Sequence, residues 1–365
     1  MIRFKGSRHF RQRVLLANLS RRPIRIDEIR AKDESPGLRD FEANLLRLFE
    51  KLCNGVIVEI NETGTSMRYK PGHITGGGGL EHDCSLSRGI GYYLEPLLLL
   101  GLFGKKPLSI TLRGITNHVL DPSVDTFKSV TIPFLKSVGI EGVDLKVVKR
   151  GAAPGGGGEV VLTVPIVKSL PAVRATEEGM VRRVRGIAHA MRVTPQAANR
   201  CVDGARGVLN DFLADVYIFT DHMTGAKAGA SPGYGVTLVA ETTAGRLVSA
   251  EVVADAPGRG KELTESGRVP EDIGARAARA LLEEVARGGV VDTSHQGLAV
   301  LLAALGPEEI AELRFGPLTA YAVQTLRHVR EVFGVRFTIR PEEKTSTVFL
   351  SCVGCALKNT ARSTI

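Results

Sequence analysis

The sequence predicts an α+β fold in which short strands alternate with helices and a smaller domain is inserted late in the chain. Three observations indicate this class. Strand-type and helix-type apolar periodicities alternate, two tetraglycine runs each stand beside a strand-like segment, and the composition changes near residue 180. The chain has 365 residues, more than one compact domain usually holds. We therefore expect repeated strand-and-helix units together with a second domain.

The first half of the chain carries two helical patterns among several short strands. Apolar residues at 38, 41, 45, 48 and 52 recur at the helical period, which predicts a helix over 37–52. A second helical pattern covers 123–138, and the apolar run 97–103 has the character of a buried helix end. Short β-type patterns predict strands at 23–29, 56–60, 108–112, 145–148 and 160–164.

The two tetraglycine runs differ in their surroundings. Run 155–158 lies between two predicted strands, so we expect a hairpin connection there. Run 76–79 is followed by His82 and Asp83, which are too few ligands for a metal site, so we expect a flexible turn. Neither run is a P-loop, because no Lys-Ser or Lys-Thr pair follows it. The sequence predicts no metal site.

The second half contains the predicted inserted domain, at 182–276, between a first part at 1–181 and a last part at 277–365. Its expected elements are a strand at 181–187, helices over 195–214, and strands at 235–241 and 247–253. The last part follows with helices at 272–287 and 319–333 and a strand at 335–339. Between these helices, His295 is either a catalytic base or a structural residue, and its place at a helix start favours the structural role.

Charge and composition limit the classes of partner. Net charge is +9, and residues 1–40 alone carry eleven basic and five acidic side chains. A second basic cluster contains Arg182, Arg183, Arg185 and Arg192. Two such clusters favour an anionic partner such as RNA over a merely solvated surface. No apolar run reaches the roughly 20 residues of a membrane span, so no membrane partner is expected.

Cysteine use indicates a reducing compartment. The chain has five cysteines at wide spacing, which argues against a disulfide framework. Cys352 and Cys355 form a lone CxxC pair, whereas a structural zinc site needs two further ligands. We expect two small, half-buried thiols.

The predicted helix 319–333 has two distinct faces. We expect Ala322, Leu326, Val329 and Phe333 to be buried, from their spacing. The opposite face would then expose Tyr321, Gln324, Arg327, His328 and Glu331, with Arg330 at its margin. Such a face is either solvated or able to grip phosphates.

Several motifs, in order along almost the whole chain, resemble the RNA 3'-terminal phosphate cyclase family. They occupy residues 69–77 (Tyr-Lys-Pro-Gly-His-Ile-Thr-Gly-Gly), 113–125 (Arg-Gly-Ile-Thr-Asn-His-Val-Leu-Asp-Pro-Ser-Val-Asp), 149–160, 184–188 and 231–235. Segments 79–85 and 103–117 resemble the cyclase-like branch of the family more than the true cyclases. The resemblance implies three repeated two-helix, four-strand units with a smaller α/β domain inserted in the last part.

The resemblance also implies that the cyclase chemistry is lost. True cyclases use ATP to adenylate a histidine, and the position of that histidine falls on Tyr321. A phenol with a pKa of about 10 is mostly protonated at neutral pH. The family's opening Glu-Gly-Gly-Gly-Gln segment is replaced by residues 4–8, ahead of Arg11, and its Asp-Gln pair is replaced by His295 and Gln296. We therefore expect no cyclase activity and no cofactor.

The resemblance implies that the chain is located in the nucleus, in the nucleolus, and acts there in 18S rRNA maturation. It would join the small-subunit processome, contact pre-rRNA and bind a ribosome-biogenesis GTPase. The candidate RNA-binding residues are Arg8, Arg11, Arg327, His328 and Arg330. Three alternatives stay open: a pre-rRNA endonuclease using Arg327, His328 and Arg330, a residual ATP-dependent cyclase, and a binding module for the GTPase alone.

Overall fold

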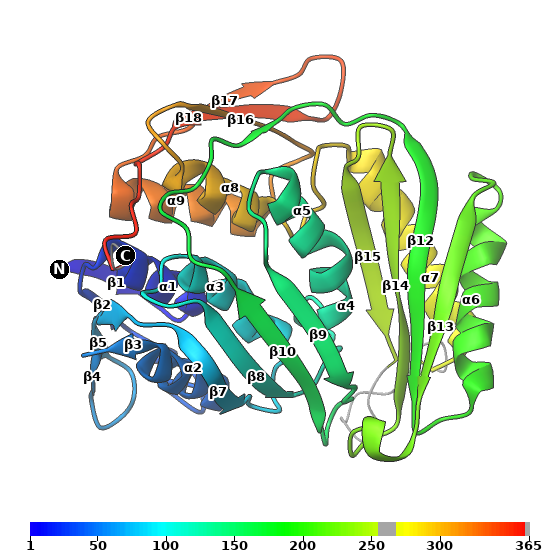
Figure 1. Cartoon of the computed structure of the whole chain (residues 1–365), viewed down its shortest axis with the longest axis horizontal. Helices are drawn as coiled ribbons and strands as arrows, with labels where there is room; N and C mark the ends of the chain where they lie inside the picture. The colour runs from blue at the N-terminus through cyan, green and yellow to red at the C-terminus, as the bar shows by residue number, and fades with distance from the viewer. Residues whose placement is uncertain (255–267, 362–365) are drawn as a thin grey trace.

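The computed structural model describes residues 1–254 and 268–361, whose strands form four four-stranded sheets with helices packed beside them (Figure 1). The α+β class predicted from the sequence is confirmed. Within these residues, no helix combines the length and hydrophobicity needed to cross a bilayer.

The first sheet comes from the N-terminal part of the chain. Its elements are β1 (Ile2–Lys5), α1 (Phe10–Ser20), β2 (Ile24–Asp27), α2 (Asp40–Leu52), β3 (Cys53–Asn54), β4 (Ile57–Ile60), β5 (Met67–Lys70) and β6 (His73–Ile74). The strand order is β1-β2-β5-β4, with β1 and β2 parallel and the other pairs antiparallel. Strands β3 and β6 form a separate pair. Helix α1 makes the crossover that a parallel pair requires.

Helix α2 illustrates how the local sequence sets an element. Its predicted apolar stripe is buried, with Leu45, Leu48 and Leu52 inaccessible or nearly so. The Glu42 carboxylate accepts the backbone N–H of Arg39 at 2.9 Å, which satisfies a donor at the helix start. The prediction of a helix over 37–52 is confirmed, with its first turn beginning three residues later.

The second and third sheets repeat the strand order of the first. The second contains β7 (Gly77–Asp83), α3 (Gly91–Leu102), β8 (Leu108–Gly114), α4 (Val124–Thr126), η1 (Phe127–Thr131), α5 (Ile132–Ser137), β9 (Asp144–Lys149) and β10 (Gly158–Val164), ordered β7-β8-β10-β9. The third contains β11 (Arg174–Ala175), α8 (Gln296–Leu305), β16 (Ile310–Phe315), α9 (Ala320–Phe333), β17 (Thr338–Pro341) and β18 (Val348–Val353), ordered β11-β16-β18-β17. Each sheet has one parallel and two antiparallel pairs.

The fourth sheet lies between β11 and α8 in the sequence. Its elements are β12 (Val181–Met191), α6 (Pro195–Leu209), β13 (Val216–Met223), η2 (Gly225–Lys227), β14 (Gly233–Thr242), β15 (Leu247–Val253) and α7 (Pro270–Arg287), with strand order β13-β12-β14-β15. Helices α6 and α7 pack together beside this sheet, at the right of Figure 1. Its buried apolar residues form a core separate from the main one, which the other three sheets share.

Buried polar contacts of Arg150 and Asp292 help to join the fourth sheet to the rest of the molecule. The Arg150 guanidinium donates to both carboxylate oxygens of Asp125 at 2.7 Å, and its Nε donates to Asp221 of β13 at 2.7 Å. Ser249 of β15 donates to Asp292 through its backbone N–H at 2.9 Å and its hydroxyl at 2.7 Å. These links fix the fourth sheet against the second and third.

The chain enters and leaves the fourth sheet at one place. Glu178, just before β12, accepts the backbone N–H of Gly289, just after α7, at 2.8 Å. The same carboxylate pairs with Arg314 of β16 at 2.9 Å. The two connections are therefore anchored side by side on the third sheet.

The structure corrects several local predictions. Residues 77–79 begin strand β7 instead of forming a flexible turn, and at Gly76 an added Cβ would lie 2.2 Å from the carbonyl oxygen of Lys106. The strand predicted at 335–339 begins only at Thr338. Segment 123–138 is helical but divided among α4, η1 and α5. The hairpin connection at 155–158 is confirmed, since β9 and β10 pair antiparallel across it.

Candidate functional site

The start of helix α9 is fixed by residues from two elements. The Thr319 hydroxyl accepts the backbone N–H of Ala322 at 3.0 Å and so caps the helix. Gln296, at the start of α8, accepts the backbone N–H of Thr319 at 2.9 Å and donates to the carbonyl of Pro317 at 3.1 Å. This framework sets the position of Tyr321 in the first turn of α9.

Tyr321 faces a carboxylate and a guanidinium. Its hydroxyl donates to Oε1 of Glu95 in α3 at 2.9 Å. The other oxygen of Glu95 pairs with Arg11 of α1, which also donates to the carbonyl of Tyr92 at 3.0 Å. The side chains of Arg11 and Glu95 are each only 14% exposed. Three helices from distant parts of the chain therefore meet at one hydrogen-bonded group.

The electrostatics of this group keep the phenol protonated. Burial and then the Glu95 carboxylate raise the pKa of Tyr321 well above its ordinary value. Burial works against the charge of Arg11, but Glu95 and Tyr321 outweigh it and raise the Arg11 pKa. Because its raised pKa keeps the phenol protonated at neutral pH, Tyr321 is a poor nucleophile.

His328 is buried, which contradicts the prediction that it lies on an exposed face. Its Nδ1 donates to Gln12 of α1 at 2.7 Å, while its Nε2 accepts from Gln324 at 3.0 Å and from Arg13 at 3.4 Å. Burial and then the Arg13 charge lower the pKa of His328 to about 3. The face of α9 that carries His328 packs against α1. The prediction had left this face open to solvent. A neutral histidine with both ring nitrogens engaged is not available as a general base.

The remaining candidate RNA-binding residues divide into two groups. Arg8, Arg327 and Arg330 are exposed. Arg11 turns inward to Glu95 and so takes part in the buried group around Tyr321. His9 lies between the two sets of contacts, with its ring 5.4 Å from that of Tyr321 and 5.8 Å from that of His328.

His295 belongs to the link between the third and fourth sheets. Its Nδ1 lies 2.6 Å from Asp292, and its Nε2 lies 2.8 Å from the hydroxyl of Thr131. Burial opposes protonation of His295, but the Asp292 carboxylate outweighs it and raises the pKa. With both nitrogens engaged at a buried position, this histidine joins η1 to the start of α8.

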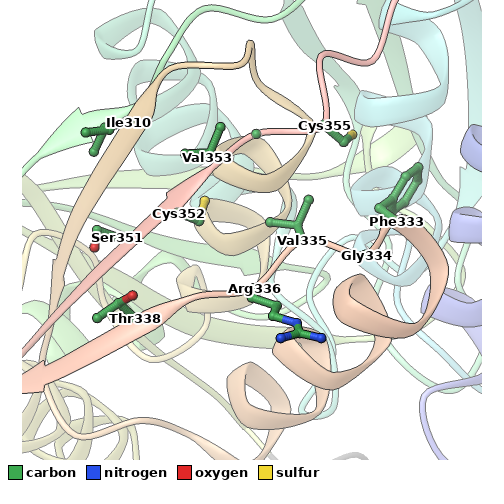
Figure 2. Close-up of a pocket in the computed structure, with 11 residues that line it drawn as sticks. Ile310, Phe333, Gly334, Val335, Arg336, Thr338, Ser351, Cys352, Val353 and Cys355 are labelled. Atoms are coloured by element: carbon green, nitrogen blue, oxygen red, sulfur yellow. The ribbon is translucent and has the colours of Figure 1, made fainter.

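The two cysteines of the CxxC pair line an open groove of about 590 Å³ at the third sheet (Figure 2). Burial and then Cys355 raise the pKa of Cys352 to about 12, and burial raises the pKa of Cys355. Both thiols are therefore protonated at neutral pH. Among the residues that the structure describes, no group of three or more His, Cys, Asp or Glu side chains is placed to hold a metal ion.

Sequence reasoning missed Glu95, Gln12 and Gly297. Glu95 is the one acidic residue in the apolar sequence of α3, and an isolated charge in such a helix is a signal of buried pairing. At Gly297 an added Cβ would lie 2.3 Å from the Tyr321 ring, so only glycine fits beneath it. Gln12 contacts His328 across 316 positions and leaves no local signal.

Together, the fold and the site define a class: an α+β protein of three like-ordered sheets and a fourth inserted sheet, with a protonated tyrosine at a buried ionic group. The family model described as RNA 3'-terminal phosphate cyclase matches residues 2–339. The chain belongs to this family.

Curated relatives match this chain over almost its whole length. A probable RNA 3'-terminal phosphate cyclase-like protein of Arabidopsis thaliana is 53% identical, covering 99% of this chain and 98% of its own length. An RNA 3'-terminal phosphate cyclase-like protein of Homo sapiens is 47% identical, with 99% and 97% covered. The rRNA processing protein rcl1 of Schizosaccharomyces pombe is 43% identical, with 99% and 97% covered.

Proposed function

We propose that this chain is a non-cyclising member of the family that acts in rRNA processing. The observation that carries the loss of cyclase chemistry is the raised pKa of the Tyr321 phenol, which lies beside the Glu95–Arg11 ion pair where the resemblance puts the family's histidine. The name of the Schizosaccharomyces pombe relative, rRNA processing protein rcl1, supports the role in rRNA processing. The family fold would then serve binding in place of nucleotidyl transfer.

The finer parts of the proposal follow the family resemblance. The chain would act in the nucleolus, within the small-subunit processome, in 18S rRNA maturation, and would bind a ribosome-biogenesis GTPase. The net charge of +9 and the exposed Arg8, Arg327 and Arg330 suit contact with pre-rRNA. The buried, neutral His328 weakens the endonuclease alternative, because cleavage would need an accessible base.

Domain organisation is part of the same proposal. The shared strand order of the first three sheets supports three copies of one two-helix, four-strand unit. The separate core of the fourth sheet supports an inserted domain. Since that core includes Leu281, we propose that the insert extends beyond the predicted boundary at 276 to the end of α7.

Incubation with ATP labelled at the α-phosphate tests the loss of cyclase chemistry. We expect no labelled protein from this chain under conditions in which an active family cyclase is labelled as a positive control. An RNA oligonucleotide ending in a 3'-phosphate should likewise stay uncyclised. A protein–AMP adduct, or a 2',3'-cyclic end that depends on ATP, would overturn the proposal.

Binding of labelled pre-rRNA fragments tests the RNA contact. Reversing charge at Arg327 and Arg330 should weaken binding and flatten its dependence on salt. With fewer phosphate contacts, binding releases fewer counterions from the RNA. Reversing the two exposed arginines Arg25 and Arg68, which pair with Asp27 and Glu59 on the first sheet, serves as a control of equal charge change. Equal affinity of the variant and the wild type would remove these arginines from the RNA contact.

A further inference from the structure

The fourth sheet has one face covered by helices and another that is only half covered. Val184, Ile218 and Leu238 point toward α6 and α7 and are buried. On the opposite face, Glu251 of β15 accepts from Ser123 and Thr126 beside η1, which closes the β14–β15 half. The β12–β13 half of this face is covered by Arg150 at Asp221 and is left open at Tyr217 and Phe219.

The open half carries two exposed aromatic side chains. Tyr217 and Phe219 are neighbours on the same face of β13, with their side chains 50% and 55% exposed. Their rings meet edge to face with centroids 4.5 Å apart. Large apolar rings half exposed on an edge strand leave much apolar surface in water, which indicates a binding function.

Arginines stand next to these rings. In the register of the parallel pair, Arg185 lies beside Tyr217 and Ile187 lies beside Phe219. The Arg185 guanidinium is held by both oxygens of Asp215 at 2.7 and 3.0 Å. Arg182 and Arg183 share the single carboxylate of Glu241. The cluster therefore has one more positive charge than negative charges, and its guanidinium groups are oriented rather than free.

A pocket of about 320 Å³ opens beside the aromatic pair. Phe219 and Ile187 line its apolar side, while Arg185 and Ser129 offer donors and Glu241 offers an acceptor. An apolar wall with both donors and an acceptor suits a flat heterocycle that carries hydrogen-bonding edges, as a nucleobase does.

We propose that the open half of the β12–β13 face binds single-stranded RNA, with bases against Phe219 and Tyr217 and the phosphates near Arg182, Arg183 and Arg185. Aromatic rings on an exposed sheet, flanked by arginines, are how sheet-based RNA modules hold unpaired bases. The charge of the cluster favours a polyanion over a neutral apolar peptide. The inference rests on the proposed role in rRNA processing and assigns an RNA surface away from α9.

Fluorescence anisotropy with the full chain and a labelled single-stranded RNA of about twelve nucleotides tests the site. The double variant Tyr217→Ser/Phe219→Ser should bind about tenfold or more weakly, the usual loss for a base–aromatic stack. Phe212→Ser is the matched control, because Phe212 is 67% exposed in the same region but lies outside this face. Thermal unfolding should show that the double variant keeps its fold.

A charge-matched pair separates a specific contact from general attraction. Arg185→Glu should weaken binding, whereas Arg200→Glu should not, although Arg200 is likewise paired with an acid, Glu271 of α7. Ultraviolet crosslinking followed by mass spectrometry should place the RNA on the peptide that contains Tyr217 and Phe219. Unchanged affinity of the double variant, or crosslinks found only elsewhere, would overturn the inference.

The outcomes also separate this site from the proposed function. If charge reversal at Arg327 and Arg330 weakens RNA binding while the Tyr217/Phe219 variant does not, the sheet site is wrong and the role in RNA binding stands. If the wild-type chain binds neither the oligonucleotide nor pre-rRNA, both fail. If the double variant keeps full RNA affinity but loses a protein partner, the face binds protein and the inference is wrong.

Discussion

The hydroxyl of Tyr321 in α9 donates to the carboxylate of Glu95 in α3 at 2.9 Å, across 226 positions of sequence. This contact joins helices of the second and third sheets, and Arg11 extends it to a helix of the first. The place where the resemblance puts a nucleophile is thus a structural junction. Its energetics can be measured independently of any activity.

Loss of the Glu95 charge should destabilise the fold. Glu95→Gln leaves the Arg11 guanidinium largely buried without a counter-charge, and breaking such a pair costs about 3 kcal/mol. Urea unfolding measures the change. The control Glu59→Gln breaks the exposed pair with Arg68 and should change stability by less than about 1 kcal/mol. Equal effects of the two variants would show that the Glu95 pair is not buried in solution.

Two glycine-to-alanine substitutions should change the free energy of unfolding in opposite directions. In a helix this change ordinarily stabilises by about 0.5–1 kcal/mol. That gain is expected at Gly207 of α6, where an added Cβ meets no atom within 4 Å. At Gly297 of α8, the added Cβ would lie 2.3 Å from the Tyr321 ring, so we expect a loss of about 1–3 kcal/mol. Stabilisation by both variants would contradict the close packing on Tyr321.

The buried His328 should make stability fall in acid. Its folded pKa is about 3, below the unfolded value of about 6.5, so the unfolded chain binds the proton more readily between these values. Stability contributed by neutral His328 is thus present above about pH 6.5 and declines toward pH 3. His328→Gln should reduce the slope of unfolding free energy by up to about 1.4 kcal/mol per pH unit in this window. Urea unfolding at several pH values measures this slope. An unchanged slope in the variant would contradict a buried neutral imidazole.

Removal of Arg150 should loosen the fourth sheet selectively. Arg150→Met leaves Asp125 buried and unpaired, which costs about 3–5 kcal/mol. It also removes the link to Asp221 in β13. Hydrogen exchange should therefore rise most in β12 and β13 and least in the core around α3. Uniform protection in all four sheets, equal to that of the wild type, would show that this link does not hold the fourth sheet in place.

Elements whose stabilising residues are close together in the sequence could be predicted, and contacts between distant residues could not. Helix α2 is marked by its own apolar period, and the hairpin at 155–158 by its glycines, so both could be predicted. Helix α9 was located correctly and its predicted inward residues Ala322 and Val329 are buried, but His328 was wrongly placed on the exposed face, because its partner Gln12 lies on α1. A polar side chain is predicted to be exposed when its hydrogen-bond partner lies hundreds of residues away in the sequence.

The candidate site was predictable in part for the same reason. Tyr321 and Arg11 were singled out by their register in the family resemblance, yet Glu95, which joins them, lies in a segment recognised only as apolar. The exposed Tyr217 and Phe219 lie in β13, a strand that the sequence analysis did not predict, so its open face could not be anticipated either.

The contact between Glu178 and Gly289 has a consequence for how this protein can be divided experimentally. Because the chain leaves the third sheet and returns to it at one spot, a short glycine bridge from Glu178 to Gly289 spans the gap. Of the described elements, the excised segment would retain β12 to β15, α6 and α7. Producing the shortened chain and the excised segment separately would then show which of the two carries each binding activity.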